Sequence, residues 1–501
     1  MNKICNTLKQ SVYTKWIIKQ RTNLFISISI SIFLTILTYP GILYSDSYGR
    51  IAMSENVKTS IYAFLHGEIE NYPTGSWLTV TPSFFIMLSK AIVGSIVLYT
   101  FIQSLSFLFF TYVYNDQLNE NKHPVWNKLC LLLSPVIWAF SIYYEASVGC
   151  VTAILAMLLL IWKWRVLQSV FDKVITIILL IFSSFVCFGY RANAFSIIPV
   201  IFIIVLLREK KIFSRLAIMV SVFLGFIGTF LVPAILNINT MSSYSAGFAW
   251  EIVSTIQSMD TEKQEEYKNY LDDIFGEGST KAAIHVSIYD EQEATINPMF
   301  ESPINPVNIS AEGNSAKLIK KYVKLAVNEP KAFLKMKWEF ISHTLGIEKP
   351  INLFEYNYNR GEQMDEYGFN DSPQRERFVN LFHAFMEFMV IFRRPWILYL
   401  VSLILILIWR FKFCGKNSPI NLYEASFGVA LFYYGAYILN TQSFEFRYFF
   451  PSWLLLFSII IGLSSQLLLN KKRTRIIAAL VFVVVFIIPF IGGLVKYKII
   501  F

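Results

Sequence analysis

Four charged side chains stand where long apolar runs of this sequence end. They are Asp46, Glu145, Arg191 and Arg447. A charge at the centre of a membrane helix costs about 2.5–3.5 kcal/mol on insertion scales, so charges retained beside apolar runs call for a reason. A carboxylate can take a proton from a hydroxyl group or bind a divalent cation. The guanidinium fork of arginine meets two phosphate oxygens at once. Two acids and two arginines at one level therefore predict a site where a hydroxyl acceptor meets a phosphate leaving group.

Each acid also has a plain structural interpretation. Asp46 lies between two serines after Pro40-Gly41, and it could cap a short helix that begins near Tyr48. The capping role and a role as a base are compatible, since one carboxylate can serve both. Glu145 could serve only as the partner of an arginine.

The basic and aromatic candidates have alternatives of the same kind. Arg191 follows Tyr190 and could reach lipid headgroups, as long basic side chains do at membrane edges. Arg447 and Tyr448 lie in an aromatic segment of a type that is common at membrane interfaces. His66 could extend the site from the first loop, although a solvated polar face is the simpler interpretation.

The composition indicates the elements that must position these residues. Hydrophobic residues make up 55% of the 501 residues and charged residues only 16%, and the mean hydropathy is +0.50. The apolar runs are continuous rather than alternating, which predicts an all-α polytopic membrane protein and excludes a barrel. The net charge of +10 comes from basic clusters in short loops between these runs. That pattern marks inner loops and argues against a nucleic-acid partner.

The apolar runs predict about 11 transmembrane helices, with the N-terminus in the cytoplasm and lysine or arginine in every inner loop. Residues 1–237 form an N-terminal membrane module with a long first outer loop at 41–94, where a turn at 72–75 precedes an interfacial helix at 77–91. Residues 238–393 form a small extracytoplasmic domain that includes two amphipathic helices within 317–344. Residues 394–501 form a C-terminal membrane module. The five cysteines are scattered, so neither a disulfide framework nor a cysteine metal site is expected.

Four features of this layout resemble the GT-C superfamily of membrane glycosyltransferases. They are an acid just after the first span (Ser45-Asp46-Ser47), an acid at the second outer turn (Glu145), an arginine-containing outer turn (Tyr190-Arg191-Ala192-Asn193), and Arg447-Tyr448-Phe449-Phe450-Pro451 at a late span.

The resemblance implies an inverting enzyme that takes a sugar from a polyprenyl-phosphate-linked donor. Asp46 would be the general base on an acceptor hydroxyl, and Glu145 would orient it, the acceptor or a metal. Arg191 and Arg447 would hold the phosphate. The acceptor would be an envelope glycan, a lipid or a protein, at the outer face of a bacterial cytoplasmic membrane. The first loop has one aspartate where the family often has an Asp-x-Asp pair, so a requirement for Mg²⁺ or Mn²⁺ stays open.

Two other classes fit parts of the pattern. A polymerase or ligase of lipid-linked glycan repeats would use the outer arginines and would not need Asp46 as a base. A glycolipid transporter or flippase would often show internal repeats and charges near the middle of the bilayer. The charges noted here lie at the ends of spans instead.

Overall fold

A computed structural model gives the arrangement of the chain. It describes residues 12–43, 45–67, 72–76, 79–119, 124–132, 134–240, 244–285, 314–353, 369, 372–413, 419–440, 444–468 and 491.

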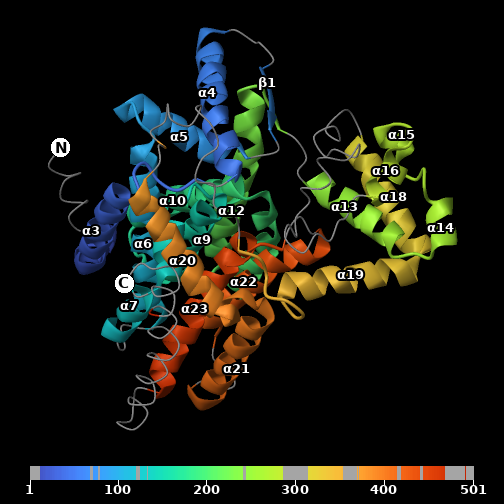
Figure 1. Ribbon diagram of the computed structural model, residues 1–501. Helices are drawn as coiled ribbons and strands as arrows, with labels where there is room; N and C mark the ends of the chain where they lie inside the picture. Colours follow the sequence, from blue (N-terminus) through green and yellow to red (C-terminus); the bar gives the residue numbers. More distant parts are fainter. Residues whose placement is uncertain are drawn as a thin grey trace.

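The first half of the described chain is a body of helices (Figure 1). Its α-helices are α2 (Val12–Lys19), α3 (Arg21–Leu37), α4 (Ser45–His66), α5 (Val80–Val93), α6 (Val97–Leu118), α7 (Pro124–Leu132), α8 (Pro135–Ile142), α9 (Ala146–Lys163), α10 (Val170–Tyr190), α11 (Ile198–Arg208) and α12 (Ile212–Ile235). Two short 3₁₀ helices, η1 (Trp164–Val166) and η2 (Ala192–Ile197), follow α9 and α10.

The second half adds an outer unit and the last helices of the body. The outer unit comprises α13 (Tyr244–Gln257), α14 (Thr261–Glu266), α15 (Asp272–Phe275), α16 (Ser279–His285), α18 (Asn314–Asn328) and α19 (Pro330–Leu345). The body continues with α20 (Pro373–Phe388), η5 (Val390–Arg393), α21 (Pro395–Phe413), α22 (Leu422–Leu439) and α23 (Phe446–Leu468).

The all-α membrane class is confirmed, but the count of about 11 spans is wrong for the described chain. Six helices are long and apolar enough to cross a membrane, or up to seven if the bent pair α2 and α3 counts as one span. They are α6, α9 with its 3₁₀ extension, α10, α12, α21 and α23. The predicted last span at 476–494 lies outside the described residues, apart from residue 491.

Local sequence explains why the other predicted spans fall short. The predicted span at 131–140 is divided between α7 and α8, which have 9 and 8 residues. The span at 197–207 is the 11-residue α11, preceded by a 3₁₀ turn. Helix α22 has 18 residues, but it carries four tyrosines and Glu424 and is not among the six. Each helical residue rises about 1.5 Å, so a helix of 8 to 11 residues extends only about 12–17 Å. That is less than the thickness of a hydrocarbon core, about 30 Å.

The predicted first outer loop is mostly helical. Helix α4 runs for 22 residues from Ser45, and α5 packs against it. The predicted turn at 72–75 is instead strand β1 (Tyr72–Ser76), which pairs in parallel with β2 (Ile238–Thr240). This pairing ties the first loop to the chain that follows α12, and it lies beside α4 in Figure 1.

Two hydrophobic cores divide the chain differently from the predicted domain boundaries. The outer unit has its own core around Trp250, Met336 and Phe340, and Phe444 joins it from just before α23. Two amphipathic helices were predicted at 317–344, and α18 and α19 are found there. Helix α20 was assigned to the outer domain, yet its side chains Phe378, Val379, Phe382 and Phe385 belong to the core of the body. The outer unit therefore ends before α20.

Candidate functional site

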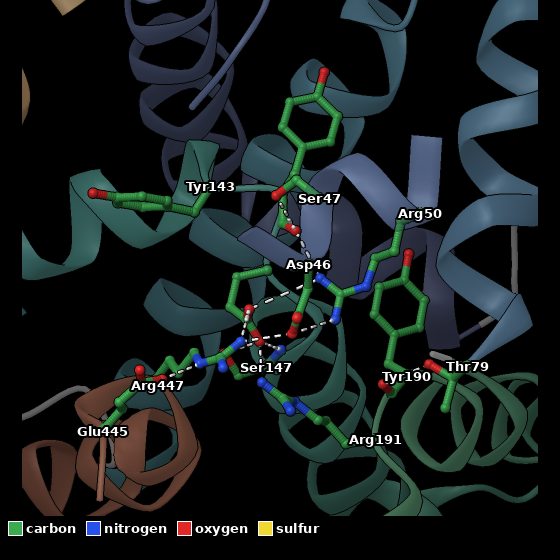
Figure 2. Close-up of polar contacts among 12 residues, drawn as sticks. Asp46, Ser47, Arg50, Thr79, Tyr143, Ser147, Tyr190, Arg191, Glu445 and Arg447 are labelled. Atoms are coloured by element: carbon green, nitrogen blue, oxygen red, sulfur yellow. Dashed lines mark hydrogen bonds and ion pairs between the residues drawn. The ribbon is translucent and has the colours of Figure 1, made fainter. Parts of the chain in front are cut away.

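The four charged residues expected at span ends come together at one place in the body. Figure 2 shows Asp46, Arg191 and Arg447 at this place. Asp46 lies in the first turn of α4, and Glu145 directly precedes α9. Arg191 directly follows α10, and Arg447 lies in the first turn of α23. Two further residues, Arg50 and Glu445, join them, and we call these six side chains the charge cluster.

A short backbone contact brings the first and second turns together. The amide of Ile42 donates to the carbonyl of Ile142 at 3.1 Å, and the amide of Tyr144 donates to the carbonyl of Ile42 at 3.1 Å. Gly41 permits this approach, because its φ is +144° and a Cβ there would lie 2.4 Å from the ring of Tyr144. Asp46 and Glu145 are thus fixed near each other by the segments just before them.

Arg447 is the centre of the charge cluster. Its Nη1 donates to Oδ2 of Asp46 at 2.6 Å and lies 3.6 Å from Oε2 of Glu145. Its Nε donates to Oε2 of Glu445 at 2.5 Å. Arg50, one helical turn after Asp46, places Nη2 3.7 Å from Oδ2 of Asp46. One guanidinium therefore links three carboxylates from three segments of the chain.

Glu145 is the most deeply buried acid of the cluster. Its side chain is 1% exposed, it pairs with Arg191, and Arg50 and Arg447 lie 3.8 and 3.6 Å away. Its Oε1 also accepts the amide of Ser147 at 3.2 Å, at the start of α9. Burial acts most strongly on the pKa of Glu145 and raises it, but the three guanidinium groups together outweigh burial and lower the pKa. Glu145 is therefore held ionised.

Exposure separates Asp46 from the rest of the cluster. The Asp46 side chain is 16% exposed, against 11% for Arg191, 9% for Glu445 and 7% for Arg447. Among the three acids, Asp46 is thus the one most open to an incoming group. The alternative in which Arg191 reaches lipid headgroups does not match its position, since it is largely buried and paired with Glu145.

Tyr448, a candidate from the sequence, lies beside the charge cluster. The guanidinium carbon of Arg191 lies 4.7 Å from the centre of its ring, and that of Arg447 lies 4.6 Å away. Aromatic faces attract cations, so the ring supports both arginines.

The structure does not bring His66 to the charge cluster. It ends α4, twenty residues after Asp46, which places it about 30 Å along the helix axis. It stacks on Tyr62 with ring centres 4.0 Å apart, and its Nδ1 lies 2.8 Å from the Tyr62 carbonyl oxygen. The prediction treated residues 41–94 as a loop that could fold back, whereas a straight helix carries His66 away.

Arg50 and Glu445 were not anticipated, although each had a signal. Arg50 lies four residues after Asp46, so a helix through this segment puts both on one face. Glu445 lies two residues before Arg447, in the segment that precedes a span.

The arrangement does not fit a divalent cation. Among the described residues, no group of three or more histidine, cysteine, aspartate or glutamate side chains could hold a metal ion. Each acid of the cluster already has an arginine nitrogen within 4 Å. The three carboxylates are already balanced by three guanidinium groups, so a dication would have to displace an arginine before it could bind.

Comparison of the chain with models of known protein families gives no match, and comparison with curated proteins gives none either.

Proposed function

We propose that the protein is a membrane glycosyltransferase that takes a sugar from a polyprenyl-phosphate-linked donor. The acceptor is an envelope glycan, a lipid or a protein, and the reaction belongs to cell-envelope polysaccharide biosynthesis. The observation that supports this most is that Asp46 contacts Arg447, while Arg191 joins the same cluster through Glu145. Asp46, Arg191 and Arg447 lie in three segments that are far apart in the sequence. A partly exposed carboxylate beside arginines suits transfer from a phosphate leaving group to a hydroxyl.

In this proposal Asp46 acts as the general base. It removes the proton from the acceptor hydroxyl while the oxygen attacks the anomeric carbon from the side opposite the phosphate. The bond between that carbon and the phosphate oxygen breaks, and its electron pair leaves with the phosphate, so the configuration inverts. A positioned base contributes roughly 10²–10⁴-fold to such a step.

The arginines stabilise the charge that develops on the leaving phosphate. Arg447 contacts Asp46 in this structure. This contact has to open for the sugar to enter, because the base and the leaving phosphate lie on opposite sides of the anomeric carbon. Glu145 is a positioning residue here, because its 1% exposure and its three arginine neighbours leave it holding guanidinium groups in place. No step in this mechanism uses a metal ion.

The proposal includes a bacterial cytoplasmic membrane, an N-terminus in the cytoplasm and a site at the outer face. It is supported by the basic residues of the N-terminal segment and of the loops between apolar runs. The donor would then reach the site sideways from the outer leaflet.

The test compares envelope glycans by mass spectrometry in wild-type cells, cells lacking the protein, and cells carrying Asp46→Asn. Glu55→Gln is the matched control, because Glu55 lies on the same helix and pairs with Lys90 at 2.6 Å outside the cluster. Membrane levels of each variant are checked by blot.

We expect the deletion and Asp46→Asn to remove the same sugar unit, and Glu55→Gln to keep it. If instead Asp46→Asn resembles wild type while the deletion shortens or abolishes the whole polymer, the general-base role fails. That outcome would favour a polymerase or ligase of lipid-linked repeats, or a transporter or flippase.

A further inference from the structure

The charge cluster is formally neutral in this structure. Three arginines face three carboxylates, and each carboxylate has an arginine nitrogen within 4 Å. A phosphate that entered this arrangement would meet as many negative groups as positive ones. Like charges repel strongly where water is excluded, so one carboxylate has to leave its arginine before an anion can bind.

Glu145 and Asp46 are poor candidates for that movement. Glu145 is buried, is surrounded by Arg50, Arg191 and Arg447, and also holds the first turn of α9. Asp46 is built into the first turn of α4, and the proposed reaction needs it in place.

Glu445 has a different setting. It lies outside any helix, immediately before α23, so the segment that carries it can move together with its side chain without unwinding a helix. Its carboxylate accepts the Nε–H of Arg447 at 2.5 Å. Carboxylate and phosphate oxygens bind guanidinium groups by the same kind of charge-assisted hydrogen bond.

The neighbours of Glu445 connect it to the outer unit. Phe444 is 3% exposed in the core of that unit, with its ring centre 5.4 Å from those of Trp250 and Phe340. The two residues that flank Glu445 both form backbone hydrogen bonds with Asn352. The amide of Asn352 donates to the carbonyl of Phe444 at 2.9 Å, and the amide of Phe446 donates to the carbonyl of Asn352 at 2.8 Å.

We propose that the phosphate of an anionic lipid binds to the side of the Arg447 guanidinium group that carries the Nε–H. In this structure the carboxylate of Glu445 occupies that place, and the phosphate displaces it. The inference rests on the proposed function, since it concerns the same donor phosphate. Movement of Glu445 pulls on Phe444 and on the backbone bridge to Asn352. Binding of the lipid phosphate therefore loosens the contact between the outer unit and the body.

The first experiment measures binding of undecaprenyl phosphate to the full-length protein in nanodiscs. Glu445→Gln removes the competing charge, so we expect binding about tenfold tighter than in wild type, which corresponds to about 1.4 kcal/mol. Glu55→Gln should bind like wild type. Inorganic phosphate is measured in parallel, and equal affinity for it would overturn a lipid as the source of the phosphate.

Two outcomes separate this inference from the proposed function. Weaker or unchanged binding by Glu445→Gln, with binding lost in Arg447→Gln, overturns the displacement and leaves the proposed phosphate site standing. Unchanged binding in Arg447→Gln overturns the phosphate site itself, and with it both proposals.

A second measurement uses the wild-type protein and does not depend on how a variant folds. Hydrogen exchange is followed at the amides of Asn352 and Phe446 with and without undecaprenyl phosphate in the nanodisc. Displacement of Glu445 predicts faster exchange at both amides when the lipid is present. Slower or unchanged exchange overturns the displacement.

Discussion

At the scale of single residues, the charge cluster is a set of buried charges that depend on one another. A buried ion pair is weak evidence for stability by itself, but removing one partner leaves an uncompensated charge and is costly. Glu145 is the clearest case, because three arginines lie around a side chain that is 1% exposed.

We therefore expect Glu145→Gln to destabilise the protein by about 3–5 kcal/mol, measured as a fall in the thermal unfolding midpoint of the solubilised protein. A carboxylate whose folded-state pKa is lowered stabilises the fold above its unfolded-state pKa, and this contribution is lost only as the pH falls toward the folded-state pKa. The difference between wild type and Glu145→Gln should thus be equal at pH 5.5 and pH 8.

The control for this prediction is Glu265→Gln, which removes an exposed partner of Lys268. Exposed pairs contribute little, so its unfolding midpoint should stay close to that of wild type. A Glu145→Gln midpoint equal to that of the control would contradict the account of the buried cluster.

The meeting of Asp46, Glu145, Arg191 and Arg447 could be anticipated from the sequence, because charges kept at the ends of apolar runs share one level of the membrane. Arg50 and Glu445 could not, since their relevance depends on the helix that starts at Ser45 and on how the chain enters α23.

At the scale of elements, α10 and α12 approach each other at a glycine. A Cβ on Gly225 would lie 2.4 Å from the carbonyl oxygen of Ile181 and 2.5 Å from the Cβ of Ser184. Small residues allow such close packing of membrane helices. Arg191 directly follows α10, so the distance between α10 and α12 affects the position of Arg191 in the charge cluster.

Gly225→Val should force these helices apart and reduce the amount of folded protein. The measurement is the fraction of fluorescently tagged protein that elutes as a single peak in size-exclusion chromatography. Gly435→Val in α22 is the matched control, because a Cβ there meets no atom within 4 Å. Equal elution profiles for the two variants would show that the α10–α12 contact is not needed for folding.

Element boundaries were predicted less well than element type. The apolar runs correctly indicated helices, and 317–344 was correctly divided at Asn328-Glu329-Pro330. The strand at Tyr72–Ser76 could not be anticipated, because its partner lies at residues 238–240 and such non-local pairing has no local signal. The segment predicted as a loop after Ser45 is the continuous helix α4, which carries His66 away from the charge cluster.

At the scale of the whole molecule, the part of the chain that the structure describes has six or seven candidate spans, where the sequence predicted an alternation of about 11 over the full chain. The count from sequence treated every apolar run as a crossing, but several runs form helices that are too short or too polar to count as spans. The sidedness of the charge cluster is therefore best tested directly.

We expect a membrane-impermeant thiol reagent to label His66→Cys in intact cells and Lys211→Cys only after permeabilisation. Both positions are exposed at helix ends, and the five native cysteines are first replaced. The first lies on α4, which begins in the cluster. The second precedes α12 in a predicted inner loop, in which Glu209 pairs at 3.2 Å with Arg165 of the predicted inner loop after α9. Labelling of His66→Cys only after permeabilisation would place α4 on the cytoplasmic side and exclude an outer-leaflet donor.

The most direct test of the central claim asks whether the Asp46–Arg447 pair does chemistry or only holds helices together. The double variant Asp46→Asn/Arg447→Gln removes one charge of each sign, so the remaining cluster stays balanced between Arg50, Arg191, Glu145 and Glu445. Replacing both members of a buried pair is often tolerated in stability. Glu445 loses its contact with Arg447 in this variant. We therefore predict an unfolding midpoint below that of wild type but above that of Arg447→Gln alone, together with loss of the same sugar unit that the deletion removes. A double variant whose envelope glycans match those of wild type would contradict the account.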